Sequence, residues 1–339
     1  MMFCGGAKDK DDQNVKPQKH VLCIGMACVD FVNIVKEFPL EDSDQRIQDY
    51  YWQRGGNASN NCTVLSLLSI PCEFMGVLGT EGVEASWILK DFESFNINTE
   101  HCVIKDVHCP VGTIILNMTN GTRTILFFPR DRPEMLYEDF QLKFKKDFSA
   151  YSWIHFELCS NVLEISKMID DVLCYENSNG QPVVSIEIEK PEFHNYNLVI
   201  NKADLVFVSK DYAKSKGFAN AKEAVSGLYN LCKEGAILVC AWSEQGASLC
   251  INNEVLTCPA LQNIKVVDTL GAGDTFVAGF VGSLLSQRFY PTEPEHTTKI
   301  ITKLEYALNY ACHLAGLKCS MYGYTGLKDC YKCIDAELK

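Results

Sequence analysis

The sequence has no excess of positive charge, no long apolar run and no common phosphate-binding loop. Its 339 residues include 31 Lys and Arg against 43 Asp and Glu, for a formal net charge of −12. This balance argues against a nucleic-acid surface and against binding to anionic membranes. No apolar run has the length of a membrane span. No G-x-x-x-x-G-K-[ST] motif occurs, which excludes a Walker A loop.

The marks of a secreted protein are also missing. Residues 1–20 are polar and contain no apolar segment before Val21, so no signal peptide is expected. The 17 cysteines are odd in number and scattered. They predict reduced thiols packed as small hydrophobes in a cytoplasmic protein. The pair Cys330-x-x-Cys333 has no second pair beside it, so it gives little support to a zinc site.

Strand-like and helix-like segments alternate along most of the chain. Strands are predicted at 21–25, 153–156, 183–188, 205–209 and 237–241, with helices at 58–68, 160–174 and 219–232. Such alternation is typical of crossover units. We therefore predict an α/β domain at residues 20–328, built on a mostly parallel sheet flanked by helices. Residues 1–19 are expected to be a disordered tail, and residues 329–339 a C-terminal tail.

A second, smaller β region is predicted from two distant pieces, 31–54 and 111–130. The second piece holds β-rich runs at 113–118 and 122–128 that meet at Asn120-Gly121, a strong hairpin signal. A small sheet over a larger domain predicts a lid, or β-clasp. Its exposed face needs cover, and a second copy of itself would provide it. A homodimer through the lid is therefore expected.

The run from Val267 to Phe276, VDTLGAGDTF, is the most informative motif. Gly271 and Gly273 let backbone amides converge on an anion at the start of a helix. A carboxylate at Asp274 would repel a phosphate unless it takes the proton from an attacking hydroxyl. Phe276 stands where a dinucleotide fingerprint needs its third glycine. The plainer alternative is a tight turn in which Asp274 caps the helix.

An earlier run, Gly55-Gly56-Asn57-Ala58-Ser59-Asn60, enters a predicted helix. Asn57 and Asn60 are three residues apart and share a helix face. Two amides pointing one way suit a ligand with many hydroxyls. Asp30, just after the first strand, could add a carboxylate to the same pocket. The alternatives are that Asn57 is only an N-cap and that Asp30 is only a polar residue near a strand end.

Together these motifs resemble the ribokinase/PfkB family of sugar and nucleoside kinases. The likeness spans residues 21–326 and is carried by the runs WQRGGNASN at 52–60, RTIL at 123–126, EIEKP at 187–191, VFVSKD at 206–211, LVCAW at 238–242 and the VVDTLGAGDTF motif. It implies a ribokinase-like fold and ATP-dependent phosphorylation of a hydroxyl. The WQRGGNASN and VCAW runs favour members that act on the 1-hydroxyl of fructose.

Two alternatives to a fructose kinase remain. One is another kinase of this family, acting on ribose, an aldose or adenosine. The other is a sugar- or nucleotide-binding protein without catalysis. The intact cluster from Gly271 to Asp274 argues against the second, since a pure binder has no use for a carboxylate aimed at phosphate.

The resemblance also implies roles for single residues. Asp274 would be the catalytic base, and the amides of Gly271, Ala272 and Gly273 an anion hole. Sugar and phosphate contacts would come from Asp30, Gly56, Asn57, Asn60, Arg123 and, from the partner's lid, Asp42. The nucleotide would lie against Lys210, Trp242, Ser243, Gly246, Ala247, Pro259, Phe276 and Cys312.

ATP, Mg²⁺ and a potassium ion beside the anion hole are the implied cofactors. The family's N-x-x-E motif for magnesium is absent, because Ser209-Lys210-Asp211-Tyr212 stands in its place. The magnesium ligands therefore stay unassigned, as does any role for residues 289–299.

Overall fold

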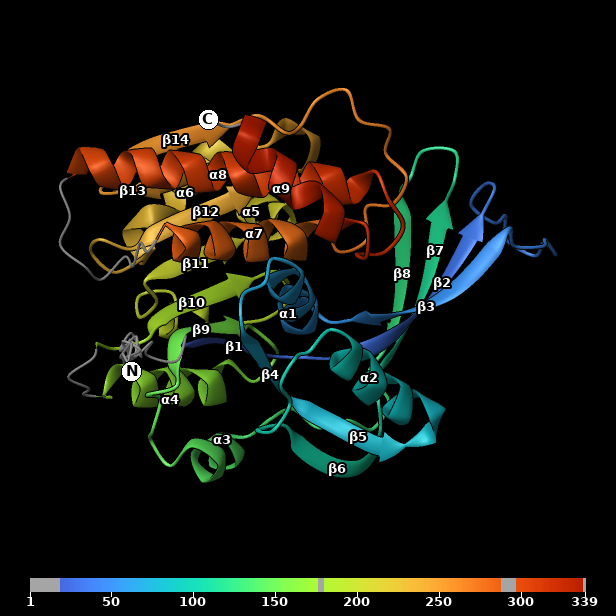
Figure 1. Cartoon of the computed structure of the whole chain (residues 1–339), viewed down its shortest axis with the longest axis horizontal. Helices are drawn as coiled ribbons and strands as arrows, with labels where there is room; N and C mark the ends of the chain where they lie inside the picture. The colour runs from blue at the N-terminus through green and yellow to red at the C-terminus, as the bar shows by residue number, and fades with distance from the viewer. Residues whose placement is uncertain (1–18, 176–179, 288–296, 338–339) are drawn as a thin grey trace, which may run out of the picture.

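The computed structural model describes residues 19–175, 180–287 and 297–337 (Figure 1). Nearly all of the predicted N-terminal tail and most of the segment 289–299 lie outside these ranges. The strands are β1 (His20–Ile24), β2 (Cys28–Val35), β3 (Asp49–Gly55), β4 (Cys72–Met75), β5 (Val77–Glu81), β6 (Val103–His108), β7 (Val111–Asn117), β8 (Arg123–Phe128), β9 (Tyr151–Glu157), β10 (Val183–Ile188), β11 (Leu205–Val208), β12 (Ile237–Ala241), β13 (Ala247–Ile251) and β14 (Glu254–Cys258). The α-helices are α1 (Asn57–Leu67), α2 (Gly82–Ser94), α3 (Tyr137–Phe144), α4 (Val162–Leu173), α5 (Lys210–Ser215), α6 (Ala221–Leu228), α7 (Ala272–Ser286), α8 (Thr297–Cys319) and α9 (Leu327–Glu337).

An eight-stranded sheet forms the centre, in the order β14-β13-β12-β11-β10-β9-β1-β4. Its pairs are parallel except for β12–β13 and β13–β14. The predicted α/β class is therefore confirmed, although the antiparallel hairpin β13–β14 was not foreseen. The strands β4 and β5 follow each other directly and are separated at Gly76, where a side chain would collide with the Gly25 carbonyl.

Helices cover both faces of this sheet (Figure 1). One core joins the sheet to α1, α2, α7, α8 and α9, and the other joins it to α3, α4, α5 and α6. The strand order reverses around β1, which lies between β4 and β9. In open α/β sheets, ligands bind beyond the carboxyl ends of the strands at such a reversal. This edge is where the site is expected.

The smaller sheet has the order β3-β2-β7-β8 and stands beside the main body (Figure 1). Alternate residues of its strands face inward. Four of these, Val32, Ile34, Ile114 and Leu116, pack on Leu270 of the VDTLGAGDTF motif. The predicted lid is therefore confirmed, and its inner face rests on the loop that leads to the expected anion hole.

Two further features bear on the predicted ends and surface of the chain. Helix α9 (Leu327–Glu337) occupies much of the stretch that was set apart as a C-terminal tail. Among the residues that the structure describes, no helix combines the length and apolarity needed to cross a bilayer.

Candidate active site

The start of α1 is fixed at the carboxyl ends of β1 and β9. Gly56 precedes the helix with φ +95°, and a side chain there would collide with the Met26 carbonyl. Glu157 Oε2, at the end of β9, accepts hydrogen bonds from the amides of Met26 (2.9 Å) and Ala58 (3.0 Å). A carboxylate at a helix N-terminus is favourable. Glu157 therefore holds the Gly56-Asn57 turn in place, a role that the sequence analysis missed.

The two asparagines of this helix reach across to acidic side chains. Asn57 Nδ2 donates to Glu187 Oε1 (3.2 Å) and Glu189 Oε2 (3.1 Å). Asn60 Nδ2 donates to Asp274 Oδ2 (2.6 Å). Gly56, and not Asn57, is the N-cap. The alternative that Asn57 serves as a cap is therefore wrong.

Asp274 lies in the first turn of α7, behind the N-cap Gly271 with φ +74°. It is not the cap residue, so the plainer interpretation of the motif also fails. Its carboxylate is buried. Burial raises the pKa of Asp274 well above its ordinary value, the nearby Glu187 raises it further, and the Asn60 amide opposes the shift. A buried carboxylate with a raised pKa is suited to accept a proton.

The N-terminus of α7 offers a place for an anion. Amides in a first helical turn have no acceptor within the helix. The Ala272 amide makes a long bond of 3.3 Å to the Thr269 carbonyl. A side chain at Gly273 would meet no atom within 4 Å, whereas one at Gly271 would collide with the Tyr324 hydroxyl. The space beside Gly273 is therefore open, whereas the space beside Gly271 is filled by Tyr324.

The acidic groups at this edge of the sheet outnumber the nearby cations, although Lys190 Nζ lies 2.9 Å from Glu189 Oε1. Burial raises the pKa of Glu157 to about 7 and raises that of Glu187, which Glu189 raises further. His155 Nε2 lies 3.7 Å from Glu187 Oε2, but burial lowers the pKa of His155 to about 3. The imidazole is therefore neutral at pH 7. Glu187 Oε2 and Asn60 Oδ1 are buried without a hydrogen-bond partner among the described residues.

The lid contributes Asp30 and Arg123. Asp30 lies on the inner face, where side chains at Gly55 or Gly112 would collide with its carboxylate. Burial raises the pKa of Asp30 to about 6. Arg123 Nη1 donates to Thr269 Oγ1 (3.3 Å), which in turn donates to the Gly121 carbonyl (3.2 Å). These hydrogen bonds hold the lid hairpin against the loop that precedes the expected anion hole.

Asp42 is placed apart from these residues. It lies exposed in the loop that joins β2 to β3, with φ +58°.

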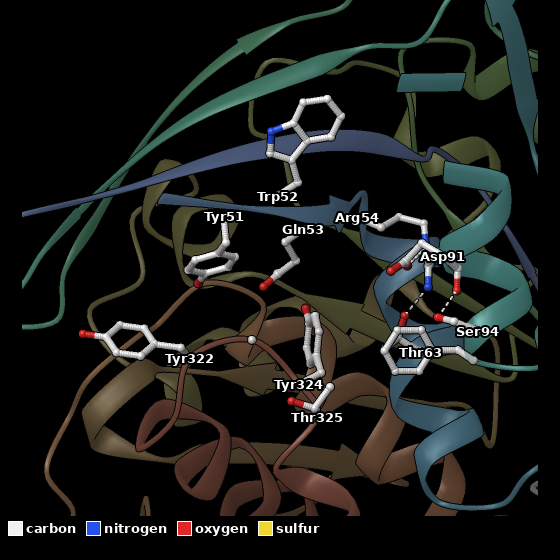
Figure 2. A pocket seen from close by; sticks show the side chains of 12 residues that line it. Tyr51, Trp52, Gln53, Arg54, Thr63, Asp91, Ser94, Tyr322, Tyr324 and Thr325 are labelled. Atoms are coloured by element: carbon white, nitrogen blue, oxygen red, sulfur yellow. Dashed lines mark hydrogen bonds and ion pairs between the residues drawn. The ribbon is translucent and has the colours of Figure 1, made fainter. Parts of the chain in front are cut away.

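A cavity of about 420 Å³ opens between β3, α1, α2 and the loop at 322–325 (Figure 2). The hydroxyls of Tyr51 and Tyr324 and both amide atoms of Gln53 are buried there with no partner among the described residues. Arg54 lies at its edge and donates to Asp91 (2.7 Å) and Thr63 (2.7 Å), which ties the lid strand to α2 and α1. The sequence analysis predicted neither the cavity nor this tie.

The expected nucleotide residues are only partly brought together. Lys210 Nζ, at the start of α5, lies 3.4 Å from Ser243 Oγ. Gly246, with φ +90°, packs against the Cys258 carbonyl and Pro259, and Ala247 follows it in β13. Phe276, on α7, and Cys312, on α8, belong to the same core. The Trp242 ring lies in the core on the other face of the sheet. The Trp242 ring therefore does not share a core with Phe276 and Cys312, and the nucleotide pocket as a whole stays a prediction.

Comparisons with known proteins agree with this architecture. Residues 18–329 match the model of the pfkB family carbohydrate kinases. The chain is 38% identical to a ketohexokinase from Mus musculus over 317 residues, which cover 91% of this chain and 99% of that protein. It is 24% identical to a nucleoside kinase from Thermoplasma acidophilum over 77% of this chain and 80% of that protein. The ribokinase structure from Giardia lamblia superposes with a TM-score of 0.76 at 16% identity, covering 95% of this chain and 99% of that one. The chain therefore belongs to the pfkB family of carbohydrate kinases.

Proposed function

We propose that this kinase transfers the γ-phosphate of ATP to the 1-hydroxyl of a ketohexose, converting fructose to fructose 1-phosphate. The observation that carries the proposal is the 2.6 Å bond from Asn60 to Asp274, which joins the amide-bearing face of α1 to a buried carboxylate at an open helix N-terminus. A sugar hydroxyl placed there would meet a base and an anion site together. The 38% identity to the mouse ketohexokinase supports fructose over ribose or adenosine.

In this proposal the residues fall into three groups. Asp274 accepts the proton of the attacking hydroxyl, and Asn60, whose amide contacts the Asp274 carboxylate, also binds a sugar hydroxyl. The amides of Gly271, Ala272 and Gly273 stabilise the charge on the transferring phosphoryl group. Asp30, Asn57 and the backbone at Gly56 bind the other sugar hydroxyls. These groups are buried, so contacts left unmade would be costly.

Nucleotide binding is assigned to the neighbouring strand ends. Lys210 and Arg123 would approach the phosphates. Adenine and ribose would lie against the residues from Ser243 to Ala247 together with Pro259, Phe276 and Cys312.

The carboxylates of Glu187 and Glu189 fit magnesium, since Mg²⁺ is held through one or two carboxylates, waters and substrate phosphates. When bound, it would neutralise charge on the phosphates. Potassium beside the anion hole fits less well. The ammonium of Lys318 already contacts both the carboxylate and the carbonyl of Asp268 there.

The direct test measures ADP release with ATP and Mg²⁺ against fructose, other ketohexoses, ribose, glucose and adenosine. Fructose should give the highest kcat/KM. Ribose or adenosine in first place would replace the ketose assignment with another kinase of the same family. If none of these compounds leads to ADP release although the nucleotide binds, a non-catalytic binding protein would be favoured.

The lid supports a homodimer. All of β8 is exposed, and Ile125, Leu126, Phe127 and Phe128 are 45–61% exposed. Monomers rarely expose apolar patches of this kind, and a small sheet with an uncovered apolar face needs a partner. Asp42 would then reach the sugar of the second chain.

Mixing tests the shared site. Asp42→Ala chains and Asp274→Ala chains should each be inactive as homodimers. Their mixture should recover part of the wild-type rate, because a mixed dimer holds one site with both groups. A fully active monomer in sedimentation would contradict the shared site while leaving the kinase assignment in place.

A further inference from the structure

Lys318, near the end of α8, is a charged side chain with no exposed surface. Its relative exposure is 0%, and so is that of Asp268. Lys318 Nζ donates to Asp268 Oδ2 (2.6 Å) and to the Asp268 carbonyl (3.2 Å). Lysine is almost never fully buried unless it is paired. Asp268 stands three residues before Gly271, so the pair lies beside the loop that leads to the proposed anion hole.

Asp268 organises the loop that leads to this hole. Its Oδ1 accepts from the Leu270 amide (2.8 Å), and its Oδ2 accepts from the Gly323 amide (3.3 Å). The amides of Val267 and Asp268 itself donate to the Cys319 carbonyl (2.7 and 3.1 Å). The loop is therefore clamped to the end of α8, with the ammonium at the centre of the clamp.

A bound potassium ion at this point would need the same oxygens. Potassium binds oxygen atoms, and the buried oxygens on offer just before the loop are the carboxylate and the carbonyl of Asp268, which both already accept an N–H from Lys318. Two cations on the same oxygens would repel each other strongly in so buried a place. Within the described residues, the ammonium of Lys318 therefore already supplies a positive charge beside the expected anion hole, where the family resemblance implies a potassium ion.

We propose that the Lys318 ammonium is a built-in cation that positions the anion-hole loop, so that this kinase needs no potassium beside that loop. The proposal rests on the assignment of Gly271–Gly273 as the anion hole. Lys318 is a positioning residue here: it acts on the loop through Asp268 and does not touch the substrate.

The first experiment uses the unaltered protein. Phosphorylation of fructose is measured in potassium chloride and in tetramethylammonium chloride at equal ionic strength, since tetramethylammonium is too large to enter a potassium site. The two rates should agree within about twofold. A rate that is roughly tenfold higher or more in potassium would overturn the proposal.

Variants of Lys318 sharpen the test. Lys318→Met keeps the length of the side chain and removes its charge, and it should lower kcat by about 100-fold with little change in the KM for sugar. Lys318→Ala leaves room beside Asp268, and adding potassium or methylammonium should raise the kcat of this variant by at least about tenfold. Lys328→Met, at an exposed position of α9, is the matched control and should behave as wild type. Full activity of Lys318→Met would contradict the proposal.

Thermal unfolding gives a second readout that needs no turnover. The Tm of the wild type should be the same in potassium and tetramethylammonium, whereas that of Lys318→Ala should rise with potassium or methylammonium alone. A potassium-dependent Tm in the wild type would overturn the proposal. If the Tm pattern is as expected but no sugar is phosphorylated, the proposed function fails and the cation role of Lys318 stands. If Lys318→Ala does not fold, the wild-type comparison decides.

Discussion

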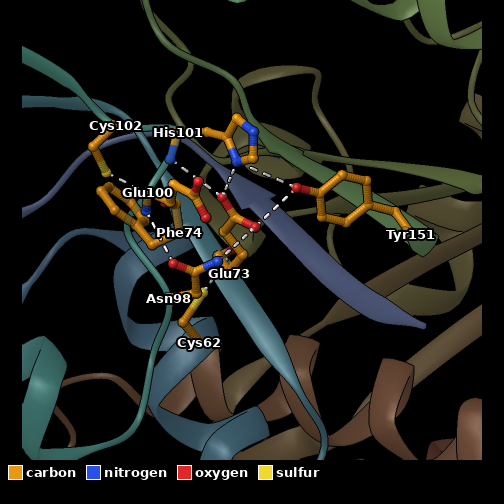
Figure 3. Close-up of polar contacts among 8 residues, drawn as sticks. All are labelled: Cys62, Glu73, Phe74, Asn98, Glu100, His101, Cys102 and Tyr151. Atoms are coloured by element: carbon orange, nitrogen blue, oxygen red, sulfur yellow. Dashed lines mark hydrogen bonds and ion pairs between the residues drawn. The ribbon is translucent and has the colours of Figure 1, made fainter. Parts of the chain in front are cut away.

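Among the described residues, the buried carboxylate cluster around Glu73 and the one around Asp274 are built differently. Glu73, on β4, is 2% exposed, and its oxygens accept from Tyr151 Oη (2.8 Å), Asn98 Nδ2 (3.2 Å) and the His101 amide (3.3 Å) (Figure 3). The His101 ring nitrogen adds a further contact. This carboxylate is well supplied with donors.

The cluster around Asp274 is undersupplied. Glu187 Oε2 and Asn60 Oδ1 are buried without partners among the described residues, and the nearest imidazole, that of His155, is neutral. Burial raises the pKa of Asp274, Glu157 and Glu187 in turn. A satisfied buried carboxylate stabilises a fold, whereas an unsatisfied group costs free energy until a ligand supplies the missing contacts. The first cluster is therefore structural, and the second is prepared for a ligand.

The largest expected effect concerns Asp274. Asp274→Ala should lower kcat by about 10²–10⁴-fold while fructose and ATP still bind, because a base acts in the transition state. The turnover rate measures the loss of kcat, and calorimetry measures the binding of fructose and ATP. Asp329→Ala, at an exposed position of α9, is the control. A variant that keeps more than roughly a tenth of the wild-type turnover would exclude Asp274 as the base.

The opposite result is expected at Glu73. Glu73→Ala leaves the Tyr151 hydroxyl and the Asn98 amide without their buried acceptor, and should lower the free energy of unfolding by about 3–4 kcal/mol. The kcat of the folded enzyme should not change. Denaturant unfolding and a rate measured well below the Tm test this, with the exposed Glu93→Gln as control. A large loss of kcat in the folded variant would erase the distinction between the two clusters.

In the proposed function, Asn57 and Asn60 connect the second cluster to the sugar. Asn57→Ala and Asn60→Ala should each raise the KM for fructose by about 10–100-fold and that for ATP much less, since each leaves a buried sugar hydroxyl without a partner, which costs about 1–3 kcal/mol. Asn201→Ala, at an exposed position, provides the comparison. A rise confined to the KM for ATP would move these amides to the nucleotide side.

Much of the fold could be predicted from local sequence, because strands and crossover helices repeat a simple apolar pattern over short distances. The GAGD motif could also be recognised, because its glycines and carboxylate are neighbours in the chain. Glu157 was missed because its role exists only where β9 meets the start of α1, a pairing of residues 99 positions apart. The same holds for Lys318 and Asp268, which are 50 positions apart.

Other details depended on the direction of a side chain. The VCAW run places Trp242 directly after a strand, but which sheet face receives the ring is decided by packing in the core that the sheet shares with α3–α6. The choice of Gly56 over Asn57 as the N-cap is likewise made by Glu157 and the acidic cluster. Neither the direction of the Trp242 ring nor the identity of the N-cap could be predicted from residue type and spacing.

The smallest expected effect is a pH dependence of stability. The pKa of Glu157 rises from 4.5 to about 7 on folding, so the folded chain holds its proton more tightly. Stability without ligand should therefore fall as pH rises between these values. Glu157→Gln stays neutral and can still accept from the Met26 and Ala58 amides. At pH 8 it should unfold with a free energy about 1–3 kcal/mol above that of wild type, and at pH 4 the difference should vanish. A variant less stable than wild type at pH 8 would show that the charge on Glu157 is needed.

The position of the transferred phosphate tests the central claim most directly. The wild-type enzyme is given ATP, Mg²⁺ and fructose labelled with ¹³C at C1, and the product is observed by ¹³C and ³¹P NMR. The account predicts that the C1 resonance becomes split by coupling to phosphorus and that ADP forms in equal amount. Phosphate on another carbon, or ADP formed without a sugar phosphate, would contradict it.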